Sequence, residues 1–498
     1  MPRRSSGVLP SRTEGNRPPP PTSPLSFPPM DHISALPDDA VTRIFSYLPF
    51  KDVVKTSALS RRWQYTWRTT TPHLKFDGLW HRNHEASPSG FQSLVDSVLR
   101  QCTSPTVKKF HITHFKYSKA NDPKLEHWLR IAEECRVEDL RLWLSSLWLS
   151  TDFGSTYVLP QFLFCSNWLV RLEVSLCCFS LGTAIKWPRL KVLLMERVKL
   201  SDDILGRIFR GSAVLESLEL RGCWGMKNIV IDSTSVKDLL LIGGSFSNLG
   251  KIRAPRLLSL CVSGTWDPPE GRRDISLDDV SSLVEAKLDF VIPTGWPVAK
   301  RMCRYLLKEL LEKLRGVPTI TIGGWCLQIL SLLEMEGVPS PLSKCQNLIL
   351  HAPVSPRDLP GIAYMLQSSQ CLEKFVISLT DFPLSVLWID KEFKERINFD
   401  EEEDFLCSQK GNFRCLAKHL KRVEITGFET DRYGLKHLLA LIKLLLGDTL
   451  ALEKMIIKAE LCTRHTAVHP ELLGVSRTVL SYRRASKNTE VIFNYPFK

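Results

Sequence analysis

The chain has 498 residues, 44% of them hydrophobic, and carries 66 Lys and Arg against 53 Asp and Glu, a formal net charge of +13. This hydrophobic content excludes a disordered protein, and the length predicts two to four domains or one long repeat array. The basic residues are scattered among acidic ones, whereas nucleic-acid recognition needs a concentrated basic stripe, so we do not expect a nucleic-acid partner.

The sequence has neither an N-terminal apolar segment typical of a signal peptide nor an apolar run of 18 residues. We therefore expect a protein of the nucleus or cytoplasm, without a membrane partner. Its 14 cysteines include no C-x-x-C pair and mostly stand beside apolar residues, which favours buried, reduced thiols.

Residues 1–30 are rich in proline, including the run Pro18 to Pro21, and contain few large apolar residues. This composition predicts a disordered, mildly basic leader. A plastid transit peptide, which is also rich in Arg and Ser, is the alternative.

The first predicted helix spans residues 38–48, because Val41, Ile44, Phe45 and Leu48 recur at helical spacing and form one apolar stripe. Asp38 and Asp39 can accept bonds from the first free N–H groups, and Pro49 ends the helix.

Two more short helices are predicted over residues 51–58 and 61–68, with Ser60 as N-cap of the third and Trp63 and Trp67 one turn apart. Three helices in so few residues cannot enclose much of a core, so we expect apolar area to remain exposed for a partner.

This stretch resembles an F-box, with the Leu36-Pro37-Asp38 opening, Ile44 to Leu48 in the first helix, Val53-Val54 in the second, and Leu59 to Trp63 followed by Trp67. The resemblance implies docking onto a Skp-type adaptor of a cullin ubiquitin ligase. An ordinary helical hairpin inside a larger domain is the alternative. The expected adaptor-binding residues are Leu36, Pro37, Ile44, Leu48, Pro49, Val53, Val54, Leu59, Trp63 and Trp67.

From Val107 onward the pattern apolar-x-x-apolar-x-apolar occurs thirteen times, at intervals of 21 to 48 residues. The last two apolar residues of each unit face one side of a short strand, which only stacking on neighbouring units can bury. The units resemble degenerate leucine-rich repeats, and Cys177 and Cys223 stand where such repeats place Asn or Cys. A doubly wound α/β fold is the alternative, although it needs longer helices than the 21-residue intervals hold.

The predicted fold class is therefore α/β, in which a three-helix F-box precedes a curved leucine-rich-repeat solenoid with parallel strands and convex helices. Helical patterns over residues 298–314 and 324–336 supply two of these convex helices. After an acidic run at residues 400–404 the chain resembles the FBD region of plant F-box proteins, with a helix expected over residues 433–446. The predicted domains are 1–30 leader, 31–76 F-box, 77–400 repeats and 401–490 FBD-like region.

Catalytic and metal motifs are not recognisable, so we predict a non-catalytic protein with no cofactor or metal. The segment from Gly244 to Lys251 has one residue too many for a phosphate-binding loop and indicates a turn between repeats. The pairs His111/His114 and His81/His84 lack Cys or carboxylate companions and are interpreted as surface histidines.

Two functions are compatible with these patterns. The first is a substrate receptor of an SCF-type ligase, whose repeats bind an unknown protein target for ubiquitination. The second is a non-ligase repeat scaffold that binds a protein, RNA or small ligand, in which the apolar F-box surface packs against the first repeats near Phe110 and Ile112. Residues between the inward apolar positions are candidate target contacts: Arg141, Glu173, Leu194, Glu219, Leu240, Cys261 and Lys374.

Overall fold

The structure is a computed structural model that describes thirteen stretches of the chain. They are residues 35–81, 88–104, 107–145, 156–180, 182, 184–243, 249–265, 276–291, 297–341, 343–380, 413–428, 435–459 and 470–495. The predicted leader, residues 244–248 of the glycine-rich segment and the acidic run lie outside them.

Three short helices open the described chain: α1 (Asp38–Tyr47), α2 (Phe50–Lys55), which runs into the single turn η1 (Thr56–Ala58), and α3 (Trp63–Thr70). Ser60 caps α3 as predicted, because its Oγ accepts a bond from the N–H of Trp63 at 3.3 Å. Asp38 does not cap α1 with its side chain; it pairs with Arg62 at 2.7 Å and so ties α1 to the start of α3.

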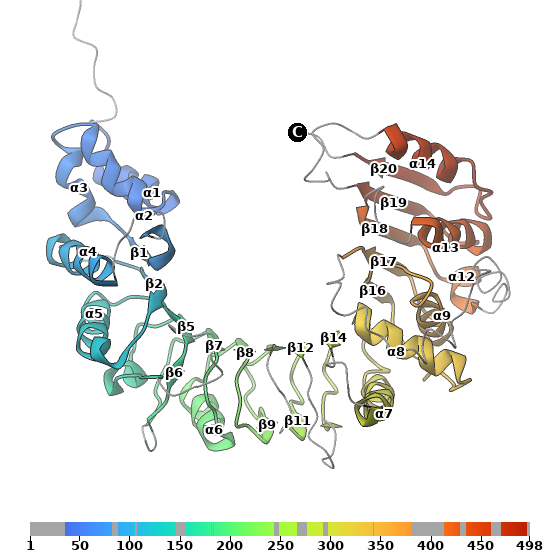
Figure 1. Cartoon of the computed structure of the whole chain (residues 1–498), viewed down its shortest axis with the longest axis horizontal. Coiled ribbons are helices and arrows are strands. Elements are labelled where there is room, and N and C mark those ends of the chain that lie inside the picture. The colour runs from blue at the N-terminus through green and yellow to red at the C-terminus, as the bar shows by residue number, and fades with distance from the viewer. Residues whose placement is uncertain are drawn as a thin grey trace, which may run out of the picture.

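The main sheet contains fifteen parallel strands that follow one another in chain order and line the inner side of an open arch (Figure 1). They are β1 (His73–Asp77), β2 (Lys109–Lys116), β3 (Asp139–Ser145), β5 (Arg171–Ser175), β7 (Val192–Glu196), β8 (Ser217–Arg221), β10 (Asp238–Ile242), β12 (Ser259–Thr265), β14 (Glu285–Val291), β15 (Thr319–Gly323), β16 (Asn347–His351), β17 (Lys374–Ser378), β18 (Arg422–Phe428), β19 (Lys454–Ala459) and β20 (Glu490–Asn494). The thirteen predicted units all form strands of this sheet, and β1 and β20 extend it at its two ends.

Equivalent apolar positions lie opposite one another along the whole sheet. Leu218, Leu239 and Leu260 are direct partners on neighbouring strands, and each is at most 1% exposed. Leu348 occupies the same position farther along and is fully buried. The predicted curved solenoid with one parallel sheet is therefore confirmed.

Among the described residues, the helices between the strands cover the outer side of the arch and leave the inner side of the sheet bare, which excludes the doubly wound alternative (Figure 1). They are α4 (Pro88–Gln101), α5 (Asp122–Glu134), α6 (Asp202–Gly211), α7 (Pro297–Lys313), α8 (Gly324–Met335), α9 (Leu359–Ser368), α12 (Arg414–Lys418), α13 (Leu435–Asp448) and α14 (Pro470–Leu480). Helices α7, α8 and α13 correspond to the three predicted ones. Where the interval between strands is short, the outer side is instead built by the small strands β9 (Asn228–Val230), β11 (Lys251–Arg253) and β13 (Ser276–Leu277).

Residues with a left-handed backbone conformation turn the chain at the ends of successive strands. Gly222, Gly243 and Gly264 have φ values of 55°, 65° and 106°. The N–H of Gly222 donates to the carbonyl of Ile242, and that of Gly243 donates to the carbonyl of Ser263, both at 2.8 Å. These glycines therefore allow adjacent turns to stack closely.

Candidate protein-binding surfaces

The interior of the F-box helices is aromatic. Trp63 packs edge-on against Phe45 with ring centroids 5.6 Å apart, and Trp67 packs edge-on against Phe50 at 6.1 Å. Trp63, Trp67 and Val53 are only 3%, 5% and 1% exposed. The expectation that these three residues leave apolar area exposed for a partner is wrong, because tryptophans one turn apart share a face and that face points inward.

The outer face of the same helices carries the other predicted contact residues. Pro37, Ile44, Pro49 and Leu59 are exposed, whereas Leu36, Leu48 and Val54 are half-buried. The exposed fraction of Leu59 reaches 60%.

Sequence reasoning missed two exposed aromatic residues on these helices. Tyr47 is 76% exposed and Tyr65 is 52% exposed. Tyr47 stands three residues after Ile44, a helical spacing that places both side chains on one face and could have revealed it. The outer apolar face is therefore richer in aromatic area than the sequence suggested.

The F-box core continues into the repeats. Phe76 of β1 lies edge-on to Phe50 of α2 at 5.7 Å and to Phe110 of β2 at 6.0 Å. The helices thus pack against the first strands, as the second of the two arrangements considered from the sequence requires. Ile44, Tyr47 and Leu59 remain exposed, so their binding to an adaptor stays a prediction.

Strand register places most of the predicted target contacts in one row on the inner surface of the arch. Direct pairing across β3, β5, β7, β8, β10 and β12 aligns, in order, Arg141, Glu173, Leu194, Glu219, Leu240 and Cys261. Lys374 belongs instead to the neighbouring row, between Asn347 and Arg422, because Val376 holds the equivalent place on β17.

Two carboxylates of this row are nearly enclosed by basic groups. Glu173 is 1% exposed, and its oxygens lie 2.6 Å from Nε of Arg141 and 2.6 Å from Nε of Arg171. At the other arm, Glu424 lies 3.1 Å from Nζ of Lys374 and 3.0 Å from Nζ of Lys458. Burial alone would raise the pKa of Glu424, but the two lysines hold it below its ordinary value.

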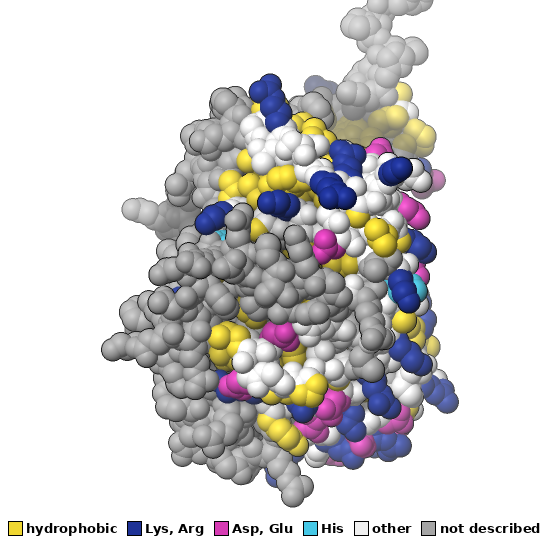
Figure 2. Space-filling model, turned by 90° about the vertical axis from the view of Figure 1, so that its right-hand side faces the viewer, with side chains coloured by type: hydrophobic (Ala, Val, Ile, Leu, Met, Phe, Trp, Pro, Cys, Tyr) yellow, Lys and Arg dark blue, Asp and Glu magenta, His cyan; other side chains and the backbone are white. Residues whose placement is uncertain are grey.

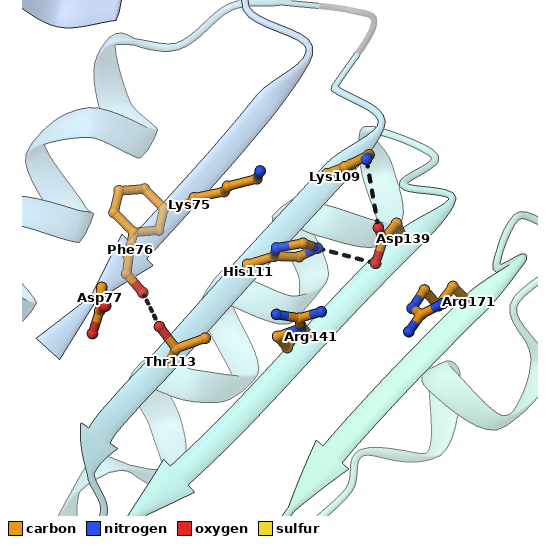
Figure 3. A pocket seen from close by; sticks show the side chains of 9 residues that line it. All are labelled: Lys75, Phe76, Asp77, Lys109, His111, Thr113, Asp139, Arg141 and Arg171. Atoms are coloured by element: carbon orange, nitrogen blue, oxygen red, sulfur yellow. Dashed lines mark hydrogen bonds and ion pairs between the residues drawn. The ribbon is translucent and has the colours of Figure 1, made fainter. Parts of the chain in front are cut away.

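A pocket of about 470 Å³ opens on the inner surface over strands β1, β2, β3 and β5 (Figure 3). Lys75, Lys109, Arg141 and Arg171 bring positive charge to it, and Asp77 and Asp139 are its acidic lining residues. Burial, followed by the positive charges of Lys109 and Lys75, lowers the pKa of the adjoining His73 to about 4.

Of the two histidines of this region, His114 is exposed as we expected, whereas His111 is not a surface residue. His111 is 8% exposed, and its Nε2 lies 3.0 Å from Oδ1 of Asp139 (Figure 3). Burial opposes ionisation of Asp139, but the bond with His111 and the charges of His111 and Lys109 hold its pKa below the ordinary value. His114 is 2.9 Å from Asp77, whereas the side chains of His81 and His84 lie outside the described residues.

The prediction of buried thiols holds for only some of the described cysteines, since Cys165 and Cys371 are exposed. Cys223 is buried where predicted, and its thiol donates to the carbonyl of Met195 at 3.2 Å. Burial raises the pKa of Cys223 to about 12 and raises that of the buried Cys177 further still, so neither thiol is reactive at neutral pH. Within the described ranges, His, Cys, Asp and Glu form no group of three or more that could hold a metal ion.

Charge on the outer surface is mixed. On the side nearest the C-terminal strands, Lys and Arg side chains alternate with acidic and hydrophobic ones (Figure 2). None of the helices in the described ranges is long and apolar enough to cross a membrane.

A helical module with an aromatic core, joined to a solenoid of parallel strands, defines the chain as a repeat protein with an N-terminal helical domain. Residues 33–75 match the F-box domain model, and residues 125–284 match the model described as FBD-associated F-box protein At5g56370, LRR repeats.

Full-length relatives agree with these matches. The F-box/LRR-repeat protein At3g18150 of Arabidopsis thaliana is 30% identical over 452 residues, which cover 86% of this chain and 87% of the relative. The F-box/LRR-repeat protein At5g02910 of the same plant is 30% identical over 353 residues, covering 70% of this chain and 72% of the relative. The chain belongs to the plant F-box/LRR-repeat proteins.

Proposed function

We propose that this protein is the substrate-recognition subunit of an SCF-type cullin ubiquitin ligase. In this role the open apolar face of the F-box docks a Skp-type adaptor, and the concave surface of the repeats holds the target. The observation that carries the proposal is the exposure of three large apolar side chains on these short helices, Ile44, Tyr47 and Leu59, whereas Val53, Trp63 and Trp67 are buried. The thioester chemistry of ubiquitin transfer would belong to other subunits of the ligase. We expect the protein to act in the nucleus or the cytoplasm.

The proposed division keeps the ranges from the sequence: a leader at 1–30, the F-box at 31–76, repeats at 77–400 and an FBD-like region at 401–490. Strand β1 nevertheless begins at His73, and β20 ends at Asn494. Deleting residues 31–76 would therefore remove most of the first strand and uncover Phe110. Point substitutions separate the two binding surfaces more cleanly than deletion.

The adaptor surface is tested with Leu59→Asp, measured by calorimetric titration of the full-length protein with a Skp-type adaptor. Truncating a central apolar anchor commonly costs about 2 kcal/mol, so we expect binding to weaken about thirtyfold or more. Val158→Asp is the matched control, because Val158 is 54% exposed on the repeat array, far along the chain from the F-box. Unchanged adaptor affinity in a folded Leu59→Asp protein would refute the assignment.

The same variant tests the separation of functions. Leu59→Asp should leave target binding intact and prevent delivery to the ligase, so the target should accumulate when the variant is overproduced. Loss of target binding in the folded variant would show that the two surfaces are not independent.

The aromatic contact of Phe76 with Phe50 and Phe110 favours a second candidate, a repeat scaffold in which the F-box only caps the sheet. That role predicts no measurable adaptor binding by the unmodified protein.

A further inference from the structure

The pocket over β1, β2, β3 and β5 holds more positive charge than its structural ion pairs need. Four cationic side chains from four neighbouring strands line it: Lys75, Lys109, Arg141 and Arg171. We propose that this pocket binds a phosphate monoester carried by a serine or threonine side chain of the target protein. The inference rests on the proposed function, in which the concave surface holds the target.

The two arginines are held in place before any ligand arrives. Oε1 of Glu173 accepts bonds from Nε of Arg171 at 2.6 Å and from a terminal nitrogen of Arg141 at 2.9 Å. The guanidinium group of Arg141 also lies 5.0 Å from the centre of the Trp143 ring. In the described part of the chain, no bond engages the two terminal nitrogens of Arg171. Donors of a fixed guanidinium group match phosphate oxygens in a fork geometry, and little side-chain entropy is lost on binding.

The two lysines complete the positive side of the pocket. Lys75 forms no ion pair within the described residues, and Nζ of Lys109 is 4.0 Å from Asp139, at the limit of such a pair. Figure 3 shows the Lys75 side chain extended toward β2, on the same side of the sheet as His111 and Arg141. Lysine ammonium groups with no close acidic partner are available to a bound anion.

The number of available donors and the size of the pocket favour a phosphate monoester over a carboxylate. Glu173, Asp139 and Asp77 balance about three of the four cations, so the pocket keeps an excess of about one positive charge. A phosphate monoester has three strong acceptor oxygens, which match the donors that Lys75, Lys109 and Arg171 offer. A volume of about 470 Å³ also accommodates the side chain that bears the phosphate.

The test uses the full-length protein and a degenerate peptide library with a central phosphoserine or phosphothreonine, beside the same library without phosphate. We expect only the phosphorylated library to be retained. Selected peptides should bind Lys75→Gln and Arg171→Gln about tenfold or more weakly, the scale of one hydrogen bond to a charged group. Arg253→Gln is the matched control: the Arg253 side chain is 46% exposed, close to the 42% of Arg171, but it lies on β11 at the outer side.

Lys75→Gln controls for misfolding, since Lys75 forms no hydrogen bond or ion pair with the buried Glu173 within the described residues. Equal retention of both libraries, or equal binding by Lys75→Gln and the unmodified protein, would overturn the proposal. It would also fail if inorganic phosphate bound as tightly as the selected peptides, or if a mixed-sequence RNA oligonucleotide bound through the same residues. Adaptor binding, measured in the same preparation, shows whether such a failure extends to the proposed function.

Discussion

At the scale of single residues, Asp358 is an acidic group whose environment opposes its charge. It is fully buried, and its Oδ2 accepts bonds from the N–H and Oγ of Ser355 at 2.7 and 2.8 Å. Within the described residues, its Oδ1 and the Oε1 of the buried Gln328 lack a hydrogen-bond partner. Burial raises the pKa of Asp358 above its ordinary value despite the bonds from Ser355 and the nearby polar side chain of Gln328, which lower it.

A raised carboxyl pKa in the folded state means that stability is lost as pH rises from the ordinary carboxyl range through the raised value. Asp358→Asn should remove this pH-dependent loss of stability, because asparagine does not ionise. The side-chain amide oxygen of the asparagine can still accept the two bonds from Ser355. We expect the variant to be more stable at pH 8 by about 1–2 kcal/mol, the cost of one unsatisfied buried polar group. Thermal unfolding from pH 4 to 8 measures this difference in stability between the variant and the unmodified protein.

Asp232→Asn is the control, because Asp232 is exposed, and it should change stability by no more than about 0.5 kcal/mol. If stability depended on pH identically in Asp358→Asn and in the unmodified protein, this explanation would be wrong.

At the scale of elements, the stacked turns depend on glycine. A Cβ atom at Gly264 would lie 2.3 Å from the backbone nitrogen of Gly243, and the φ of 106° is unfavourable for any other residue. Gly264→Ala should therefore destabilise the array by more than about 1 kcal/mol in urea unfolding. Gly316→Ala is the control, because it has open space and no left-handed φ, and should be neutral or slightly stabilising. If the two substitutions changed the free energy of unfolding equally, the turns at the strand ends would not be tightly stacked.

Sequence periodicity predicted the strands well because their inward positions are all apolar. The pattern missed β1 and β20 because Thr71 and Asn488 stand where the other units begin with an apolar residue. Thr71 is fully buried all the same. A polar residue at one position was enough to hide a whole strand.

The binding surfaces were harder to predict than the strands. Which face of a short helix is buried depends on what packs against it. The sequence alone therefore could not distinguish core residues such as Trp63 and Trp67 from residues that contact an adaptor. The pocket depends on register: His111 and Asp139 are 28 residues apart in the chain, and only pairing of their strands brings them within 3.0 Å.

At the scale of the whole molecule, Phe76 links the F-box to the repeats. Replacing this buried ring should cost about 3–5 kcal/mol and separate the melting of the F-box from that of the array. We therefore expect calorimetry of Phe76→Ala to show two transitions, with adaptor binding retained below the first. Leu348→Ala, which lies far along the array, should cost about 2–5 kcal/mol without creating an F-box transition. A single transition in Phe76→Ala would mean that other contacts couple the two parts.

The order of the strands also bears on how the protein is made. Each strand of the main sheet pairs with the strand that precedes it in the sheet order, and that order follows the chain from β1 to β20 (Figure 1). A ribosome delivers the chain in the same direction, so each emerging strand finds its template already formed on the F-box side. The arch can thus assemble during translation by addition at one growing edge, and no strand in the middle of the sheet has to wait for a partner synthesised much later.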